Sequence, residues 1–263
     1  MAFINIGQDN KVILESSCES KEVKRKLRKE KRKNSKTIAI LWSLLYFALV
    51  IGLCISGTWI YVKSNYYPIY ISGNSMNPTL RGGTKGPHDF GYIDSSSAII
   101  DGINRFDIVT TFFPFAEEDY AQPYVHGSKH NEDASHKIKR VIAVPGDTFT
   151  IRNNIIYFLE DEKEVEAQID FQYNYSTYTP VDFKSNGIGD ENGYITLKED
   201  EYWVMGDNWP DSRDSYASKN ESGGGPVYKE NIVGVLIVIV GTCEVTPDGK
   251  IINKKYETPR FFK

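Results

Sequence analysis

TIAILWSLLYFALVIGLCISGTWIYV, residues 37–62, sets the architecture of this chain, because none of its 26 positions carries a charged side chain. About 20 apolar residues cross the hydrocarbon core of a bilayer as a helix, so the stretch predicts a transmembrane helix. Trp42 near its start and Trp59 near its end suit the two membrane interfaces. A cleaved signal peptide is the alternative, but the preceding basic segment and the apolar stretch are both too long for one.

The charges on the two sides of this stretch are unequal. Residues 1–36 carry eleven Lys and Arg against five acidic residues, a net charge of +6, and the total of −4 leaves −10 for the rest. Positive segments remain in the cytoplasm, so we expect residues 1–36 there and residues 63–263 outside. The basic run 21–36 is either a helix lying on anionic lipid or only the segment that fixes topology, which we favour. We expect residues 1–20 to be poorly ordered.

Residues 63–263 are long enough for one sizeable domain, and their acidic balance argues against nucleic acid as a partner. Short β-branched or aromatic runs bounded by turn residues predict strands at 69–72, 107–113, 137–144, 148–158, 194–196, 202–205 and 232–240. The polar stretches between them are expected to be loops at 82–104 and 115–135 and a small inserted subdomain at 160–192. The expected fold is mainly β, after a single N-terminal transmembrane helix.

Neither a disulfide framework nor a metal site is expected. Cys18, Cys54 and Cys243 fall in the cytoplasm, the bilayer and the outer domain, so no two share a compartment and depth. The histidines lie in loop-like sequence without the helical spacing of zinc sites, and they are His88, His126, His130 and His136. We therefore expect no cofactor.

A serine and a lysine are the strongest candidates for chemistry. SGNSMNPTL (72–80) follows the apolar stretch closely, but a serine hydroxyl needs a base, and the histidines are badly placed for that role. A lysine can serve when burial removes water from its ammonium and lowers its pKa. In KIKRVIAVPGD (137–147), Lys139 lies on a largely apolar predicted strand. The alternative is that Lys139 points to solvent from a half-buried strand.

A third segment completes a recognisable set. MGDNWPDSRDS (205–215) packs turn formers, hydroxyls and acids after a predicted strand, and taken alone it is an Asx-rich loop. Together the three segments resemble the type I signal peptidase family, the Ser/Lys membrane proteases that remove signal peptides from exported proteins. GNSMNPTL, KRVIAVPGD and GDN with DSRDS carry the resemblance, in the family's order, and it covers the apolar stretch and residues 66–240.

The resemblance implies a catalytic pair. The family's nucleophile is the serine directly before Met, which is Ser75 and not Ser72. Its general base is the lysine before Arg, which is Lys139 and not Lys137. The implied reaction is acyl transfer, in which neutral Lys139 accepts the proton of Ser75 and backbone N–H groups hold the oxyanion.

The resemblance also implies supporting residues. The hydroxyl that orients the lysine amine falls on Ser212, and the structural acid falls on Asp214. Asp207 and Arg140 are expected to form an ion pair or loop brace. Gly73 stands where some members place a serine hydroxyl in the oxyanion hole, so we expect the hole to use backbone N–H groups, chiefly that of Ser75.

Three positions depart from the family pattern. Trp209 and Tyr216 replace arginines that are often found in the last segment, so Asp214 needs another cation, for which Arg213 is a candidate. Lys137 stands where an aromatic residue often shields the catalytic lysine, and it shares a strand face with Lys139. Its charge either lowers the pKa of Lys139 further or admits water to the site.

The implied function is cleavage of signal peptides from secreted precursors at the outer face of the cell membrane, by a single-pass enzyme of Gram-positive type. The implied partners are precursor proteins and the bilayer, with pilus or surface-protein machinery as a further candidate through the loop at 115–135. The rival is a non-catalytic assembly factor of the same fold, which typically lacks the Ser or the Lys. Residues 110–115 either dip into the outer leaflet or form a core strand followed by a turn.

Overall fold

The computed structural model describes residues 9–83, 86–112, 136–174, 180–216, 224–246 and 250–263, with side chains from residue 20 onward. The chain divides into two compact units, residues 1–62 and residues 63–263. Each unit is described by itself below.

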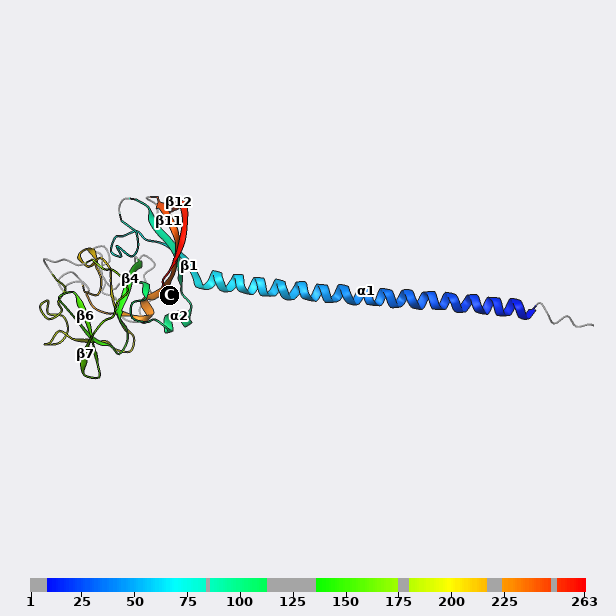
Figure 1. The fold of residues 1–263 in the computed structure, drawn as a ribbon, viewed down its shortest axis with the longest axis horizontal. Coiled ribbons are helices and arrows are strands. Elements are labelled where there is room, and N and C mark those ends of the chain that lie inside the picture. The colour runs from blue at the N-terminus through cyan, green and yellow to red at the C-terminus, as the bar shows by residue number, and fades with distance from the viewer. Residues whose placement is uncertain (1–8, 84–85, 113–135, 175–179, 217–223, 247–249) are drawn as a thin grey trace, which may run out of the picture. The chain divides into compact units, whose positions relative to one another are not determined.

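The first unit is formed by one long helix, α1 (Asp9–Asn65), drawn in blue to cyan in Figure 1. Its part from Ser20 to Asn65 is long and apolar enough to cross a membrane, with a mean hydropathy of 2.6 in its most apolar window. The expectation of poor order over residues 1–20 is wrong from Asp9 onward, because the helix already includes these residues. The helix continues without a break from the basic run 21–36 into the apolar stretch.

The second unit is built on an antiparallel sheet in the order β1-β2-β11-β3-β4-β9-β10, with β12 paired to β11. Its strands are β1 (Tyr66–Tyr70), β2 (His88–Asp94), β3 (Ile108–Phe112), β4 (His136–Ala143), β9 (Glu201–Met205), β10 (Val227–Tyr228), β11 (Ile232–Val245) and β12 (Ile251–Phe261). The expected mainly β fold after an N-terminal apolar helix is confirmed.

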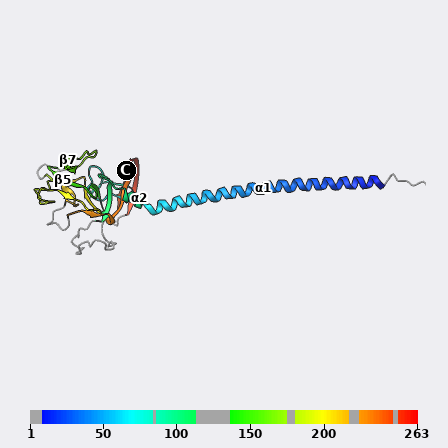
Figure 2. The same cartoon turned by 90° about the horizontal axis from the view of Figure 1, so that it is seen from below.

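A smaller sheet has the order β7-β6-β5-β8. Its strands are β5 (Thr148–Arg152), β6 (Ile155–Glu160), β7 (Lys163–Glu166) and β8 (Ile195–Thr196). Both views place it at the end of the domain away from β12 (Figures 1 and 2). The single strand predicted over 148–158 is wrong, because Asn153 and Asn154 adopt positive φ angles of 50° and 69° and turn the chain into a hairpin. The short helices are α2 (Ser97–Asp101), η1 (Trp209–Asp211) and η2 (Lys229–Asn231).

Strands β2, β7, β10 and β12 were not expected from the sequence. The error at β2 is the most instructive. This strand lies inside the predicted loop 82–104, yet it pairs with both β1 and β11 in the larger sheet. Its charged residue Asp89 is fully buried. Two arginines pair with this carboxylate, the nearby Arg81 and the distant Arg260, so a residue that is typical of loops is stabilised inside a strand.

Candidate active site

Ser75 lies on a turn between β1 and β2, in the segment 72–80, which we call the serine loop. The next residue, Met76, and the last, Leu80, are completely buried in one apolar cluster. Two backbone hydrogen bonds tighten the turn, from Asn77 N to Asn74 O (3.1 Å) and from Leu80 N to Met76 O (3.0 Å). The buried neighbours anchor the loop and hold the Ser75 side chain at its surface.

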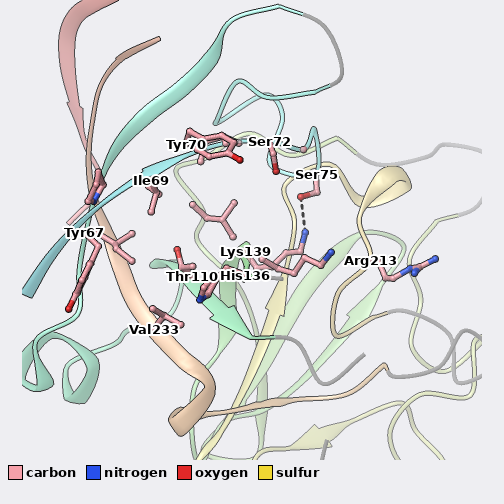
Figure 3. A pocket seen from close by; sticks show the side chains of 16 residues that line it. Tyr67, Ile69, Tyr70, Ser72, Ser75, Thr110, His136, Lys139, Arg213 and Val233 are labelled. Carbon is pink, nitrogen blue, oxygen red and sulfur yellow. Dashed lines mark hydrogen bonds between the residues drawn. The ribbon is translucent and has the colours of Figure 1, made fainter. Parts of the chain in front are cut away.

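Lys139 lies on β4 and is buried, with 2% of its surface exposed. Its Nζ is hydrogen-bonded to Ser75 Oγ at 2.7 Å, which Figure 3 marks with a dashed line. The two residues are 64 positions apart in sequence. The alternative of a solvent-facing Lys139 is therefore wrong.

Burial lowers the pKa of Lys139 to about 8, because the ammonium has lost its water. The carboxylate of Asp214 opposes this shift, and the charge of Lys137 adds to it. Lys139 is thus neutral in a fraction of the protein near pH 7, and a lysine base must be neutral to accept a proton.

Asp214 is buried beside the lysine and accepts three hydrogen bonds. The donors are Ser212 Oγ (2.5 Å), Gly206 N (2.8 Å) and Tyr216 N (3.0 Å). Burial raises the pKa of Asp214, and Lys139 and the three donors counter that rise. The Ser212 hydroxyl is thus bonded to the carboxylate, and Asp214 faces the charge of Lys139. The expectation that Arg213 supplies this cation is not met, because Arg213 is exposed at the end of the groove (Figure 3).

The main chain passes very close to Ser75 at Gly206. A Cβ added at this glycine would lie 2.3 Å from Ser212 Oγ and 2.4 Å from Ser75 O. Such distances are far below van der Waals contact, so only glycine fits without a shift of the surrounding atoms. Gly206 therefore lets the serine loop and the 205–215 segment pack directly against each other.

Arg140 and Asp207 form a bidentate ion pair, with Arg140 Nε 2.8 Å from Asp207 Oδ1 and Nη2 2.6 Å from Oδ2. Both side chains are almost fully buried. Arg140 Nη1 also donates to Phe106 O (2.8 Å), and its guanidinium lies 3.8 Å from the centre of the Phe171 ring. A buried pair of this kind fixes geometry more than it adds stability. It joins the strand of Lys139 to the segment that carries Asp214.

The two departures in the last segment have aromatic partners. Trp209 stacks on Tyr173, with 4.6 Å between ring centres, and Tyr216 stacks on Phe183. Two backbone hydrogen bonds join the same two segments, from Asn174 N to Asp207 O (2.7 Å) and from Trp209 N to Asn174 O (3.0 Å). Sequence reasoning missed these partners, because they lie in the segment 160–192 that was considered only as a polar insert.

A groove of about 720 Å³ leads to Ser75 and Lys139. Figure 3 shows its lining side chains, and the aliphatic ones are Pro68, Ile69, Ile71, Ile93, Ile138 and Val233. Six consecutive residues of the wall, 67–72, run from β1 into the start of the serine loop. Gly73 also lines the groove, and a Cβ at this position would meet nothing within 4 Å. The groove therefore runs along an edge strand, and its lining combines aliphatic side chains with polar and basic ones.

Within the described residues, no group of three or more His, Cys, Asp and Glu side chains could hold a metal ion. His126, His130, residues 113–115 and the loop at 115–135 lie outside the described residues. Residues 110–112 belong to β3, in which Thr110 and Thr111 are buried.

Comparisons with known proteins agree with the residue pattern. The family model described as signal peptidase, peptidase S26, matches residues 40–240. The chain is similar to "Signal peptidase I" of Bacillus amyloliquefaciens, with 27% identity over 214 residues, which cover 79% of this chain and 91% of the relative. It is also similar to "Signal peptidase I U" of Bacillus subtilis (strain 168), with 24% identity over 78% of this chain and 87% of the relative. A crystal structure of a signal peptidase I from Enterococcus faecalis V583 matches 51% of this chain and 96% of that chain, with 22% identity and a TM-score of 0.33.

Proposed function

We propose, from the premise that this chain belongs to the signal peptidase family, peptidase S26, that Ser75 is its nucleophile and Lys139 its general base. The chain is a membrane-associated serine endopeptidase that cleaves signal peptides from precursor proteins. The observation that supports the proposed pair is the 2.7 Å hydrogen bond between Lys139 Nζ and Ser75 Oγ at a buried lysine.

The proposed mechanism starts with neutral Lys139. Its Nζ takes the proton of Ser75 Oγ as the oxygen attacks the carbonyl carbon of the scissile peptide. The backbone N–H of Ser75 stabilises the resulting oxyanion, since Gly73 offers no hydroxyl. The Lys139 ammonium then protonates the leaving amine, which is the new N-terminus of the mature protein. A water molecule gives a proton to Lys139 and attacks the ester carbonyl of the acyl-enzyme. The ester bond to Ser75 Oγ then breaks, and Lys139 returns the proton to Oγ, which restores both residues.

Supporting roles are proposed for the residues around the pair. Asp214 keeps the Lys139 amine in place by its charge, and Ser212 acts through its bond to Asp214. Arg140 and Asp207 brace the two segments that carry Lys139 and Asp214.

The substrate is proposed to bind as an extended strand along β1. This strand ends the sheet order, so its outer edge is available for pairing with a peptide. The shallow apolar wall formed by Ile69, Ile138 and Val233 suits small side chains before the cut. Whether the enzyme serves many precursors or a few, such as pilins, is a question for substrate profiling, and the comparisons name no pilus machinery.

The proposed topology places residues 1–36 in the cytoplasm, residues 37–62 across the membrane and the catalytic domain 63–263, with its insert at about 160–192, outside. The net charge of +6 on residues 1–36, before the span, supports this orientation. Protease added to intact protoplasts should remove a tag at the C-terminus and spare a tag at the N-terminus. The opposite pattern would contradict the proposal.

The catalytic proposal is tested by cleavage of a small-x-small signal-peptide substrate by the full-length protein in detergent. Ser75→Ala and Lys139→Ala should each abolish cleavage while the fold is retained. Ser185→Ala and Lys198→Ala are matched controls at exposed positions and should retain activity. Persistent cleavage in Ser75→Ala would refute the assignment. An inactive wild type on general and pilin-type precursors alike would instead favour a non-catalytic assembly factor.

A further inference from the structure

The C-terminal strand β12 lies beyond the matched family region, which ends at residue 240, yet it contacts the serine loop. Its pairing with β11 places Arg260 opposite Ile239 and Phe261 opposite Val238. Directly after the strand, Phe262 packs against the apolar cluster that contains Met76 and Leu80. The end of the chain thus reaches the loop that carries Ser75.

Arg260 makes the most direct of these contacts. Its Nη1 donates to the backbone oxygen of Thr79 at 2.8 Å, and its Nη2 forms an ion pair with Asp89. The hydroxyl of the same Thr79 accepts a 3.5 Å hydrogen bond from Arg140 Nη2. Two arginines therefore hold one residue of the serine loop, and one of them is adjacent to Lys139.

Asp89, the partner of Arg260, connects both ends of the serine loop. Its backbone oxygen accepts from Ile71 N (2.9 Å), and its backbone N donates to Arg81 O (2.9 Å). Its carboxylate accepts from Arg81 N (2.8 Å) and Arg81 Nε (2.9 Å). Arg81 in turn pairs with Glu257 of β12. The loop is consequently fixed at its two ends and, through Arg260, at Thr79.

We propose that Arg260 is a positioning residue, which holds the serine loop so that Ser75 Oγ stays within hydrogen-bond distance of Lys139 Nζ. This inference rests on the proposed roles of Ser75 and Lys139. Without the Arg260 guanidinium, the Thr79 carbonyl loses its donor and Asp89 loses one of its two arginines. The loop then gains freedom to move away from β4. A displacement of about 1 Å in a catalytic group can cost about 100-fold in rate.

The test compares wild type, Arg260→Ala, Arg260→Gln and Arg260→Lys as full-length proteins in detergent, with Lys255→Ala as the control. Lys255 is an exposed residue on the same strand, opposite Thr242 on β11. The measurements are kcat and KM on a signal-peptide substrate, the melting temperature, and amide hydrogen exchange of residues 72–80. We expect kcat of Arg260→Ala to fall at least about tenfold with KM changed less than about twofold. We also expect faster exchange confined to the serine loop, and partial recovery of kcat in Arg260→Lys.

Two results would overturn the inference. One is a kcat of Arg260→Ala equal to that of Lys255→Ala in a folded protein. The other is a loss of activity that accompanies faster exchange throughout the domain, because this indicates general destabilisation. If Arg260→Ala does not fold, Arg260→Gln and Arg260→Lys are judged by the same criteria. Failure of the Ser/Lys assignment is recognised separately, as cleavage that survives Ser75→Ala.

Discussion

Lys139 shows at the scale of one residue how burial lowers the pKa of an amine. Its ammonium is enclosed on β4, and loss of water lowers its pKa to about 8 against the opposing charge of Asp214. Burial raises the pKa of Asp214, and the charge of Lys139 and the three hydrogen-bond donors oppose that rise. A fraction of Lys139 is therefore neutral near pH 7, while the charge of Asp214 still favours the protonated form.

The first prediction concerns the pH profile. Because only neutral Lys139 accepts a proton, kcat/KM should rise about tenfold per pH unit at low pH and level off above about pH 8. The measurement is the initial cleavage rate between pH 5 and pH 10 at substrate concentrations below KM. A flat profile between pH 6 and pH 9 would contradict a lysine base with this pKa.

The second prediction concerns Lys137. Its positive charge lowers the pKa of Lys139, so Lys137→Met should raise that pKa and move the acidic limb of the profile to higher pH. Activity at pH 7 should fall, and activity at pH 10 should change little. Lys137→Arg keeps the charge and is the matched control, whose limb should remain in place. A limb that moves to lower pH in Lys137→Met would show that solvent entry outweighs the charge.

At the scale of elements, three segments meet at the site through contacts that leave little space. The serine loop follows β1, Lys139 comes from β4, and the 205–215 segment follows β9. Asn208 N donates to Ser75 O at 2.8 Å, and the Arg140 and Asp207 pair joins β4 to the same segment. The relative position of the elements, rather than any one of them, brings Ser75 to Lys139.

The third prediction is that Gly206→Ala disrupts this junction. The added methyl would lie 2.4 Å from Ser75 O and 2.3 Å from Ser212 Oγ, so the serine loop must move. We expect kcat to fall about 100-fold, as for a displaced catalytic group. The control is Gly52→Ala, since a Cβ at Gly52 meets nothing within 4 Å. Activity of Gly206→Ala within about twofold of the control would show that the junction can adapt.

At the scale of the whole molecule, the chain combines an apolar helical unit with a β domain that carries the groove and the site. A membrane anchor at residues 37–62 would raise the local concentration of the enzyme around a membrane-bound precursor, as a tether does for any second binding event.

The fourth prediction concerns this anchor. Leu49→Arg with Leu53→Arg places two charges in the apolar stretch, at a cost of about 2.5–3.5 kcal/mol each near the centre of a membrane helix. The double variant should leave the carbonate-resistant membrane fraction in part or completely. Leu49→Ala with Leu53→Ala is the control and should remain in the membrane. Full membrane retention of the arginine variant would argue against residues 37–62 as the span.

Local sequence was sufficient for the apolar helix and for the three motifs, because both signals depend on neighbours along the chain. A run of 26 uncharged residues predicts an apolar helix without any knowledge of the fold, and the motif around Ser75 is recognised without knowledge of its partners. The mainly β class likewise followed from β-branched and aromatic runs. The start of the helix at Asp9 and the hairpin at Asn153 and Asn154 were missed, because element boundaries depend on weak local preferences.

Tertiary contacts between distant residues were required for the rest. The sequence of strand β2 predicts a loop, because Asp89 is typical of loops. Its pairing with Arg260, 171 residues away, stabilises it in the strand, and no local pattern predicts that bond. In sequence, Trp209 and Tyr216 only depart from the family pattern. The folded structure shows that they stack on the rings of Tyr173 and Phe183. The lowered pKa of Lys139 arises from the domain folded around it, because removal of water from one side chain needs the packing of many others.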